Sequence, residues 1–237
     1  MMSIEDVTHY TRAEKDQIIE SYPEHEREAR VQGIPMIGSG AIFPIADSTI
    51  RVDPFPIPRH WPRVNCIDFG YDHPQGAVQI AWDRDTDTTY ITQEYRQRET
   101  TPAVAAITLR HWGKYPWAWP HDGYQHDKGS GLQLADQYRS EGLEFHTEHA
   151  THVEGGFGTE AGIMDMLDRM QSQRFKVFST CPEWFEEKQL YHRKDGKIVK
   201  IRDDLMSATR MGVMMLRIAE TEQEIGGGNH PNIRRSI

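Results

Sequence analysis

The stretch Val64-Asn65-Cys66-Ile67-Asp68-Phe69-Gly70 decides the fold, because it is a short apolar run that ends in an acid and a glycine. This pattern predicts a buried strand that stops where the chain turns. Two more strand patterns follow at 76–82 and 88–95, and Asp85-Thr86-Asp87 between them is typical of a turn. Three successive strands with short connections predict an antiparallel meander.

Beyond the meander, helical and strand patterns alternate. Thr101-Pro102 is typical of a helix start, since threonine caps the first turn and proline is tolerated at the first helical position. The expected elements are helices over 101–112, 130–142, 159–170, 182–190 and 203–219, strands over 116–120, 143–148 and 175–178, and a hairpin over 191–201. This order predicts an α/β fold with a mixed β-sheet, an antiparallel meander followed by parallel strands, flanked by helices.

The composition is typical of a globular protein in an aqueous compartment. The chain has 237 residues, a formal charge of −9 and 37% hydrophobic residues, which is enough for a core. It has neither an apolar run of the about 18 residues that a membrane helix needs nor a secretory signal. Two cysteines, Cys66 and Cys181, cannot form a disulfide framework or a four-thiolate zinc site. We expect a cytoplasmic protein with no membrane partner, and the acidic balance argues mildly against a free nucleic-acid binder.

Three acidic positions stand where predicted elements end or begin. Asp68 ends the first core strand, Asp122 follows the strand at 116–120, and Asp203-Asp204 opens the last helix. Each acid alone could be an ordinary turn or cap residue. Together they could converge at one edge of the sheet, where carboxylates repel one another and a hard divalent cation relieves the repulsion. Two such ions about 3.5–4 Å apart can support phosphodiester hydrolysis.

With these residues in this order, the chain resembles the C-terminal nuclease domain of the large terminase subunit of tailed bacteriophages, a ribonuclease H-like fold. The resemblance rests on 67–74, Asp122 and 203–210 and covers about residues 25–220, and the segment 33–44 looks like the junction between ATPase and nuclease. By this resemblance, Asp68 is the first metal-binding acid, Asp122 the second, and the doublet holds the third. We favour Asp204, with Asp203 as a cap or accessory ligand.

The resemblance also implies a function. It implies a metal-dependent endonuclease that cleaves concatemeric double-stranded DNA with catalytic residues Asp68, Asp122 and Asp204 and two Mg²⁺ or Mn²⁺ ions. The implied partners are a terminase ATPase domain, a small subunit, a portal protein and DNA, in the cytoplasm of the host cell. The family often has a further acid where this chain has Ser207. Because the chain lacks a G-x-x-x-x-G-K-[ST] phosphate loop, we expect no ATP site in it.

The expected organisation has three parts. Residues 1–62 form a helical or extended linker segment, since 1–32 is polar and 53–62 contains four prolines. Residues 63–220 form the ribonuclease H-like nuclease domain. Residues 221–237 form a flexible tail that begins near the triple glycine at 226–228.

A basic window precedes the last acidic pair. Residues 188–202 carry six Lys or Arg against one Asp, and Asp195-Gly196 at the centre predicts a two-residue hairpin turn. The hairpin could be a solvated edge whose lysines prevent aggregation. Its closeness to the acids favours phosphate binding without sequence readout. The predicted DNA-binding residues are Lys128, Arg193, Lys194, Lys197, Lys200 and Arg202.

Some features of the sequence suggest other classes of protein. His146, His149 and His152 have a regular spacing that suggests a zinc hydrolase, but a three-residue step does not hold three imidazoles on one face. The chain has no G-x-S-x-G motif of a serine hydrolase. Resolvases and transposases, which share the ribonuclease H-like core, and a non-catalytic docking module remain as alternatives.

Overall fold

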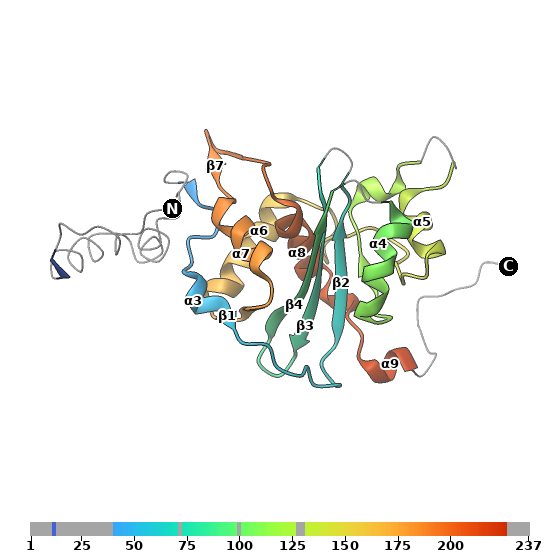
Figure 1. Ribbon diagram of the computed structural model, residues 1–237, viewed down its shortest axis with the longest axis horizontal. Helices are drawn as coiled ribbons and strands as arrows, with labels where there is room; N and C mark the ends of the chain where they lie inside the picture. The colour runs from blue at the N-terminus through green and yellow to red at the C-terminus, as the bar shows by residue number, and fades with distance from the viewer. Residues whose placement is uncertain (1–10, 13–39, 71–72, 99–100, 127–130, 227–237) are drawn as a thin grey trace.

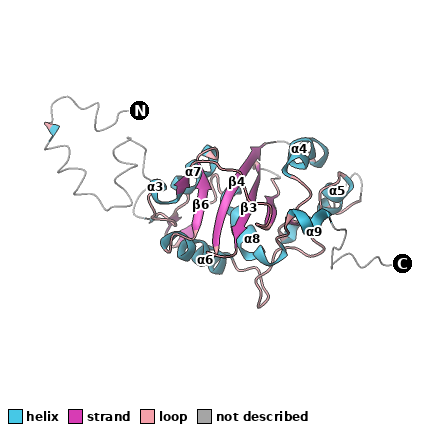
Figure 2. Ribbon diagram, turned by 90° about the horizontal axis from the view of Figure 1, so that it is seen from below, coloured by secondary structure: helices cyan, strands magenta, loops and turns pink. Residues whose placement is uncertain are grey.

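The computed structural model describes residues 11–12, 40–70, 73–98, 101–126 and 131–226. A six-stranded sheet forms its centre, and Figure 1 shows its long strands running through the middle of the molecule. The strand order is β1-β6-β4-β3-β2-β5. Helices lie on both sides of the sheet, with α6 and α8 on one side and α4 on the other (Figure 2). The predicted α/β architecture with a mixed, helix-flanked sheet is confirmed.

The three central strands form the predicted meander. β2 (Arg63–Asp68), β3 (Gln75–Asp83) and β4 (Thr88–Gln97) pair antiparallel in sequence order. Their register places Asp68 opposite Gly76, and Gly76 opposite Arg96. Because side chains of directly paired residues point to the same face, Asp68 and Arg96 flank a position that has no side chain.

The outer strands pair parallel. β5 (Trp117–Ala118) lies beside β2, and β6 (Phe175–Phe178) lies beside β4. The predicted strand over 143–148 is wrong: within it, Phe145 makes a single parallel bridge to Trp117. Since β5 is only two residues long, it offers a neighbouring chain too short an edge for a regular ladder.

The predicted linker also contributes to the sheet. β1 (Arg51–Val52) pairs parallel with β6, and the short helix α3 (Asp47–Ile50) precedes it. Residues 53–58 have no regular secondary structure and a turn follows at 59–60, closed by the amide of Trp61 on the carbonyl oxygen of Pro58. The ring centroid of Phe55 lies 5.4 Å from that of Tyr90 and 5.2 Å from that of Phe178. The predictions for residues 1–10, 13–39 and 227–237 lie outside the described residues.

The helices mostly follow the sequence. The bounds are α4 Pro102–Leu109, η3 Arg110–Trp112, η4 His121–Tyr124, α5 Leu134–Ser140, α6 Thr159–Gln171, α7 Pro182–Leu190, α8 Asp204–Met214, η5 Leu216–Ile218 and α9 Glu222–Gly226. Thr101 caps α4 as predicted, since its side chain accepts the amide of Val104. The predicted start of α5 near residue 130 is wrong, because the helix begins at Leu134 with Gln133 at the N-cap.

The last predicted helix is shorter than expected. It ends at Met214, because the amide of Met215 bonds to both Met211 O and Gly212 O and the chain tightens into η5. At its start, Asp203 occupies the N-cap position but makes no side-chain capping bond. Asp203 is therefore the cap residue by position and through its carbonyl oxygen, which accepts the amide of Ser207, but its side chain does not cap the helix.

Glycine lets α8 lie directly on the sheet. A Cβ on Gly212 would come within 2.2 Å of Cys66 Sγ and 2.6 Å of Ile80 Cδ1. A Cβ on Gly76 would lie 2.6 Å from the carbonyl carbon of Asp204. Because Gly212 meets the middle of β2 and Asp204 meets the level of Asp68, α8 runs antiparallel to β2 and its N-terminus reaches the strand's final residue.

The apolar residues form two clusters, one on each face of the sheet. Val64 and Cys66 of β2 face the larger cluster, which includes α6, α7 and α8. Ile67 faces the smaller cluster, which includes α4, α5 and three tryptophans, Trp112, Trp117 and Trp119. By alternation along the strand, Asp68 belongs to the face that α8 covers. Among the described residues, no helix has the length and apolar character to cross a bilayer.

Candidate metal centre and nucleic-acid interface

Asp68 lies where the end of β2 meets the start of α8. The strand places Asp68 on the face that α8 covers, and Gly76 allows the backbone of Asp204 to approach β3 beside it. In Figure 1 the end of β2, the beginning of α8 and the β7 hairpin all lie toward the top of the molecule. The first and third predicted acidic positions are therefore brought together.

Asp122 reaches the same edge by way of β5. Residues Asn65 and Cys66 pair with Trp117 and Ala118 in parallel, so the chain leaves β5 in the direction in which β2 ends. Asp122 lies in η4, and its buried Oδ1 atom has no hydrogen-bond partner among the described residues. A buried, unpartnered carboxylate oxygen is costly, and a cation would satisfy it.

The acids interact through their charges. Burial and the carboxylate of Asp122, with smaller effects from Asp203 and Asp204, raise the pKa of Asp68 to about 8. Burial also raises the pKa of Asp122, and burial together with Asp204 raises the pKa of Asp203. Such crowding of carboxylates is the condition that a divalent ion relieves.

Asp204 is already paired on both oxygens. Its Oδ1 lies 2.7 Å from Nδ1 of His73, and its Oδ2 accepts a hydrogen bond of 3.0 Å from Nε of Arg96. The Asp204 side chain is 3% exposed. Asp204 thus sits inside the site but, of the four acids, is the one most engaged with protein partners.

Glu187 on α7 is a site residue that the sequence did not reveal. It is fully buried, and its Oε2 accepts the amides of Leu205 at 2.7 Å and Met206 at 3.2 Å. Burial and Asp204 raise its pKa to about 7. Nothing in the acidic stretch 183–187 distinguishes Glu187 from its neighbours, because the distinction comes from which side of α7 faces α8.

The residues present fit a hard cation in their chemistry. The donors are carboxylate oxygens, which Mg²⁺ and Mn²⁺ prefer. Among the described residues, no three His, Cys, Asp or Glu side chains are placed so that they could hold a metal ion as they stand. Both oxygens of Asp204 are instead engaged by His73 and Arg96.

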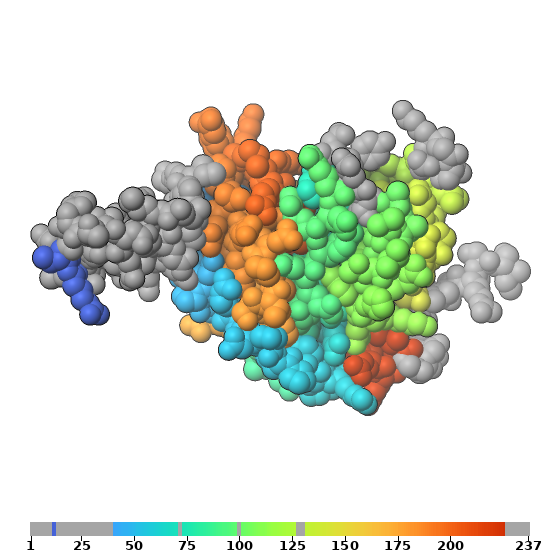
Figure 3. Space-filling view, viewed as in Figure 1, coloured from blue at the N-terminus to red at the C-terminus, as the bar shows by residue number. Residues whose placement is uncertain are grey.

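The basic hairpin forms as predicted and projects from the molecule. β7 (Arg193–Lys194) and β8 (Lys197–Ile198) pair antiparallel, and Asp195 and Gly196 have φ of 52° and 75°, as a tight two-residue turn requires. In Figure 3 the hairpin lies among the orange projections at the top.

The hairpin cations differ in their pairing. Arg193 binds Glu160 on α6 at 2.9 Å, and Arg202 binds Glu186 at 3.0 Å. Three hairpin lysines remain exposed: Lys194, Lys197 and Lys200. Lys128 lies outside the described residues.

The histidines of the zinc alternative do not converge. His146 and His152 each pair with a backbone carbonyl oxygen at 3.1 Å, and His149 packs edge-on against the ring of His121 at 4.9 Å between centroids. No metal-binding group of three exists among the residues that the structure describes. The zinc alternative has no support in this geometry.

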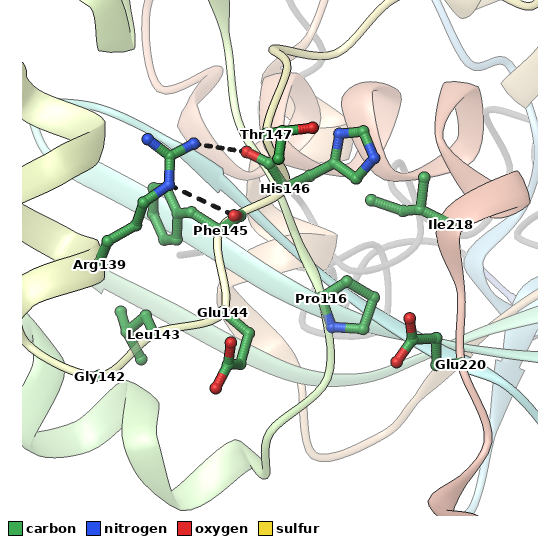
Figure 4. Close-up of a pocket in the computed structure, with 10 residues that line it drawn as sticks. All are labelled: Pro116, Arg139, Gly142, Leu143, Glu144, Phe145, His146, Thr147, Ile218 and Glu220. Atoms are coloured by element: carbon green, nitrogen blue, oxygen red, sulfur yellow. Dashed lines mark hydrogen bonds between the residues drawn. The ribbon is translucent and has the colours of Figure 1, made fainter. Parts of the chain in front are cut away.

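A pocket of about 320 Å³ lies at the opposite end of β5 (Figure 4). Pro116, which precedes β5, lines it, whereas Asp122 follows β5 at the other end. Arg139 closes one side by donating to the carbonyl oxygens of Phe145 and His146. The pocket includes none of the four site acids.

The fold and the site define a class, a ribonuclease H-like domain with acids gathered at the end of the central strand. Comparison with known proteins gives the family. The terminase RNaseH-like domain family matches residues 66–216, and the N-terminal part of the T4likevirus-type terminase large subunit matches residues 1–50. The chain therefore belongs to the terminase large subunit family and contains its RNaseH-like nuclease domain, as the sequence resemblance implied.

Individual relatives agree with this assignment. The terminase large subunit of Salmonella phage P22 is 48% identical over 226 residues, which cover 94% of this chain and 45% of that protein. The terminase large subunit of Enterobacteria phage LP7 is 49% identical and covers 90% of this chain and 46% of that protein. The chain thus spans less than half the length of these curated relatives.

A solved structure extends the comparison to the fold. The P22 large terminase nuclease domain matches with a TM-score of 0.74 and 45% identity, covering 79% of this chain and 98% of that one. The large terminase of the thermophilic bacteriophage D6E matches with a TM-score of 0.60 at 15% identity, over 91% of this chain and 55% of that one, which is a likeness of fold alone.

Proposed function

We propose that this domain is a metal-dependent endonuclease that hydrolyses phosphodiester bonds of double-stranded DNA during genome packaging. The observation that carries the proposal is the position of Asp68, a largely buried carboxyl where the end of β2 meets the start of α8. Burial and the charge of Asp122 raise its pKa to about 8. Acids with strongly shifted pKa values are concentrated at functional sites, which supports a functional role for this cluster.

The proposed metal ligands are Asp68, Asp122 and one acid of the doublet Asp203-Asp204, and two Mg²⁺ or Mn²⁺ ions are the expected cofactors. Bound divalent cations would supply Lewis-acid stabilisation of the charge that develops on the phosphate oxygens. Two proteins of like fold, the large terminase nuclease of phage G20c and the nuclease domain of phage SPP1, have been crystallised with bound cobalt and bound manganese.

The protein's own contribution is placement. Asp68 stands at the junction of β2 and α8, and Asp122 offers an oxygen without a hydrogen-bond partner among the described residues. His73, 54% exposed, pairs with Asp204 at the open side of the site. We propose that the exposed Lys194, Lys197 and Lys200 hold the phosphates of the duplex beside the acids, without reading sequence.

The proposal is tested by plasmid nicking. The chain is expected to nick supercoiled DNA with Mn²⁺ or Mg²⁺ and to lose this activity in EDTA. Asp68→Ala is expected to lower the rate by at least about 10²-fold, since it removes the central ligand. Asp85→Ala, in the exposed turn between β3 and β4, is the matched control and leaves the rate unchanged. Full activity of Asp68→Ala, or activity in EDTA, would contradict the proposal.

We propose that the domain works beside a terminase ATPase domain, with a small subunit and a portal protein, in the host cytoplasm. The match of residues 1–50 to the N-terminal part of a terminase large subunit supports the first partner. Calorimetric titration of the chain with a purified portal ring tests the last, and no heat of binding at micromolar concentrations would contradict it.

A further inference from the structure

The start of α8 is capped by a residue from another helix. The first four amides of a helix lack partners within it, and an Asp at the N-cap ordinarily accepts the amide of the second or third helical residue. Here those residues are Leu205 and Met206, and Oε2 of Glu187 accepts both amides. Asp203, the N-cap residue, makes no side-chain capping bond.

A fully buried carboxylate makes an unusual helix cap, because its charge must be desolvated. Removing the carboxylate of Glu187 from water is unfavourable unless its charge is paired. The pairing comes from Arg96, whose Nε lies 2.9 Å from Glu187 Oε1 and 3.0 Å from Asp204 Oδ2. Arg96 belongs to β4 and is 15% exposed, so the pair joins sheet, α7 and α8 in one buried network.

The consequence falls on Asp203. Because Glu187 already accepts both amides, the carboxylate of Asp203 is not needed to cap α8. It is half-buried, and its charge acts on Asp68 across the site. Asp204, in contrast, is committed to His73 and Arg96. Of the doublet, Asp203 is the acid that is available to a cation.

We propose that Glu187 is a positioning residue for the metal site: by capping α8 from α7, it keeps the carboxylate of Asp203 free to bind the cation that Asp68 and Asp122 hold. Arg96 supports this role by pairing with Glu187 and by holding Asp204 away from the cation. The inference rests on the proposed metal-dependent function and assigns the third ligand within it.

The test measures Mn²⁺ affinity by calorimetry on the DNA-free chain, with the folded fraction checked by circular dichroism. Glu187→Ala is expected to weaken Mn²⁺ binding by about tenfold or more, because Asp203 then turns to cap the helix. Glu187→Gln keeps an acceptor oxygen and is expected to stay within about threefold of the wild type. Glu183→Gln changes a half-buried acid on the same helix that also faces Arg96, and it controls for loss of charge.

A double substitution separates this mechanism from a general structural effect. Asp203→Asn is expected to weaken Mn²⁺ binding by a similar factor, and adding Glu187→Ala to it should cost less than about threefold more, since both changes remove the same ligand. Additive losses overturn the proposal, as does wild-type affinity in Asp203→Asn. If Glu187→Ala does not fold, the Asp203→Asn affinity decides alone: a tenfold loss supports the proposal and an unchanged value overturns it.

These failures differ from a failure of the proposed function. If the wild-type chain neither binds Mn²⁺ nor nicks DNA in an EDTA-sensitive way, the nuclease assignment itself is contradicted. If it does both and the variants bind as well as the wild type, only the role of Glu187 is overturned.

Discussion

Gly76→Ala tests whether the close contact between α8 and β3 positions the metal site. The backbone of Gly76 is ordinary strand, so alanine is compatible with it, but the added Cβ would lie 2.6 Å from the carbonyl carbon and 2.7 Å from the carbonyl oxygen of Asp204. Ordinary contacts begin at 3.4 Å. The first turn of α8 must therefore retreat by 3.4 − 2.6, or about 0.8 Å.

The expected loss of stability depends on how far the backbone of Asp204 can move. Overpacking typically costs about 1–3 kcal/mol, and here the obstacle is backbone rather than a flexible side chain. The smaller conformational freedom of the unfolded alanine chain returns about 0.4–1 kcal/mol. We expect a net loss of about 1–2 kcal/mol, which for a domain of this size lowers Tm by roughly 2–8 °C. A displacement near 1 Å costs catalysis up to about 10²-fold, so we expect nicking to slow by 10- to 100-fold.

The assay combines urea unfolding with plasmid nicking in Mn²⁺. The matched control is Gly158→Ala, which meets no atom within 4 Å and has a φ of −57°. This control should change stability by less than about 1 kcal/mol and leave nicking unchanged. If Gly76→Ala nicks DNA at the wild-type rate with unchanged stability, the close approach of α8 to β3 does not position the site.

Three further predictions concern charge. In EDTA, the free energy of unfolding should fall as pH rises from about 5 to 8, because the pKa of Asp68 lies at about 8 when folded and near 3.8 when unfolded. Urea unfolding should show a flatter pH dependence for Asp68→Asn, which should be the more stable protein at pH 8. An unchanged pH dependence in this variant would refute the raised pKa of Asp68. Lys188→Met removes the buried partner of Asp47, 2.7 Å away, and should lower the free energy of unfolding by about 3–5 kcal/mol. An unchanged urea midpoint would show that this ion pair does not stabilise the fold. Lys197→Glu or Lys200→Glu should weaken duplex DNA binding several-fold at moderate salt without changing Mn²⁺ affinity, and equal DNA affinity would rule out the hairpin as a phosphate contact.

Local chemistry made much of this protein predictable. The alternation of Val64, Cys66 and Asp68 belongs to a strand wherever that strand packs, and the turn at Asp195-Gly196 needs only the φ > 0 that these residues tolerate. The ends of successive elements then place acids at one edge, because parallel neighbours such as β2 and β5 end in the same direction. The resemblance to terminase nucleases rested on such local patterns in a fixed order.

Tertiary contacts decided how the acids are paired. The sequence alone determined that Asp203 and Asp204 begin a helix, since adjacent acids are favoured at helix starts. It could not determine which of them is free, because that depends on a cap from Glu187 and on Arg96, residues 16 or more positions away. It also could not show that β1 joins the sheet, or that Gly76 must lack a side chain. These features depend on which segments pack against each other. The residue pattern of one segment does not reveal which other segment it contacts.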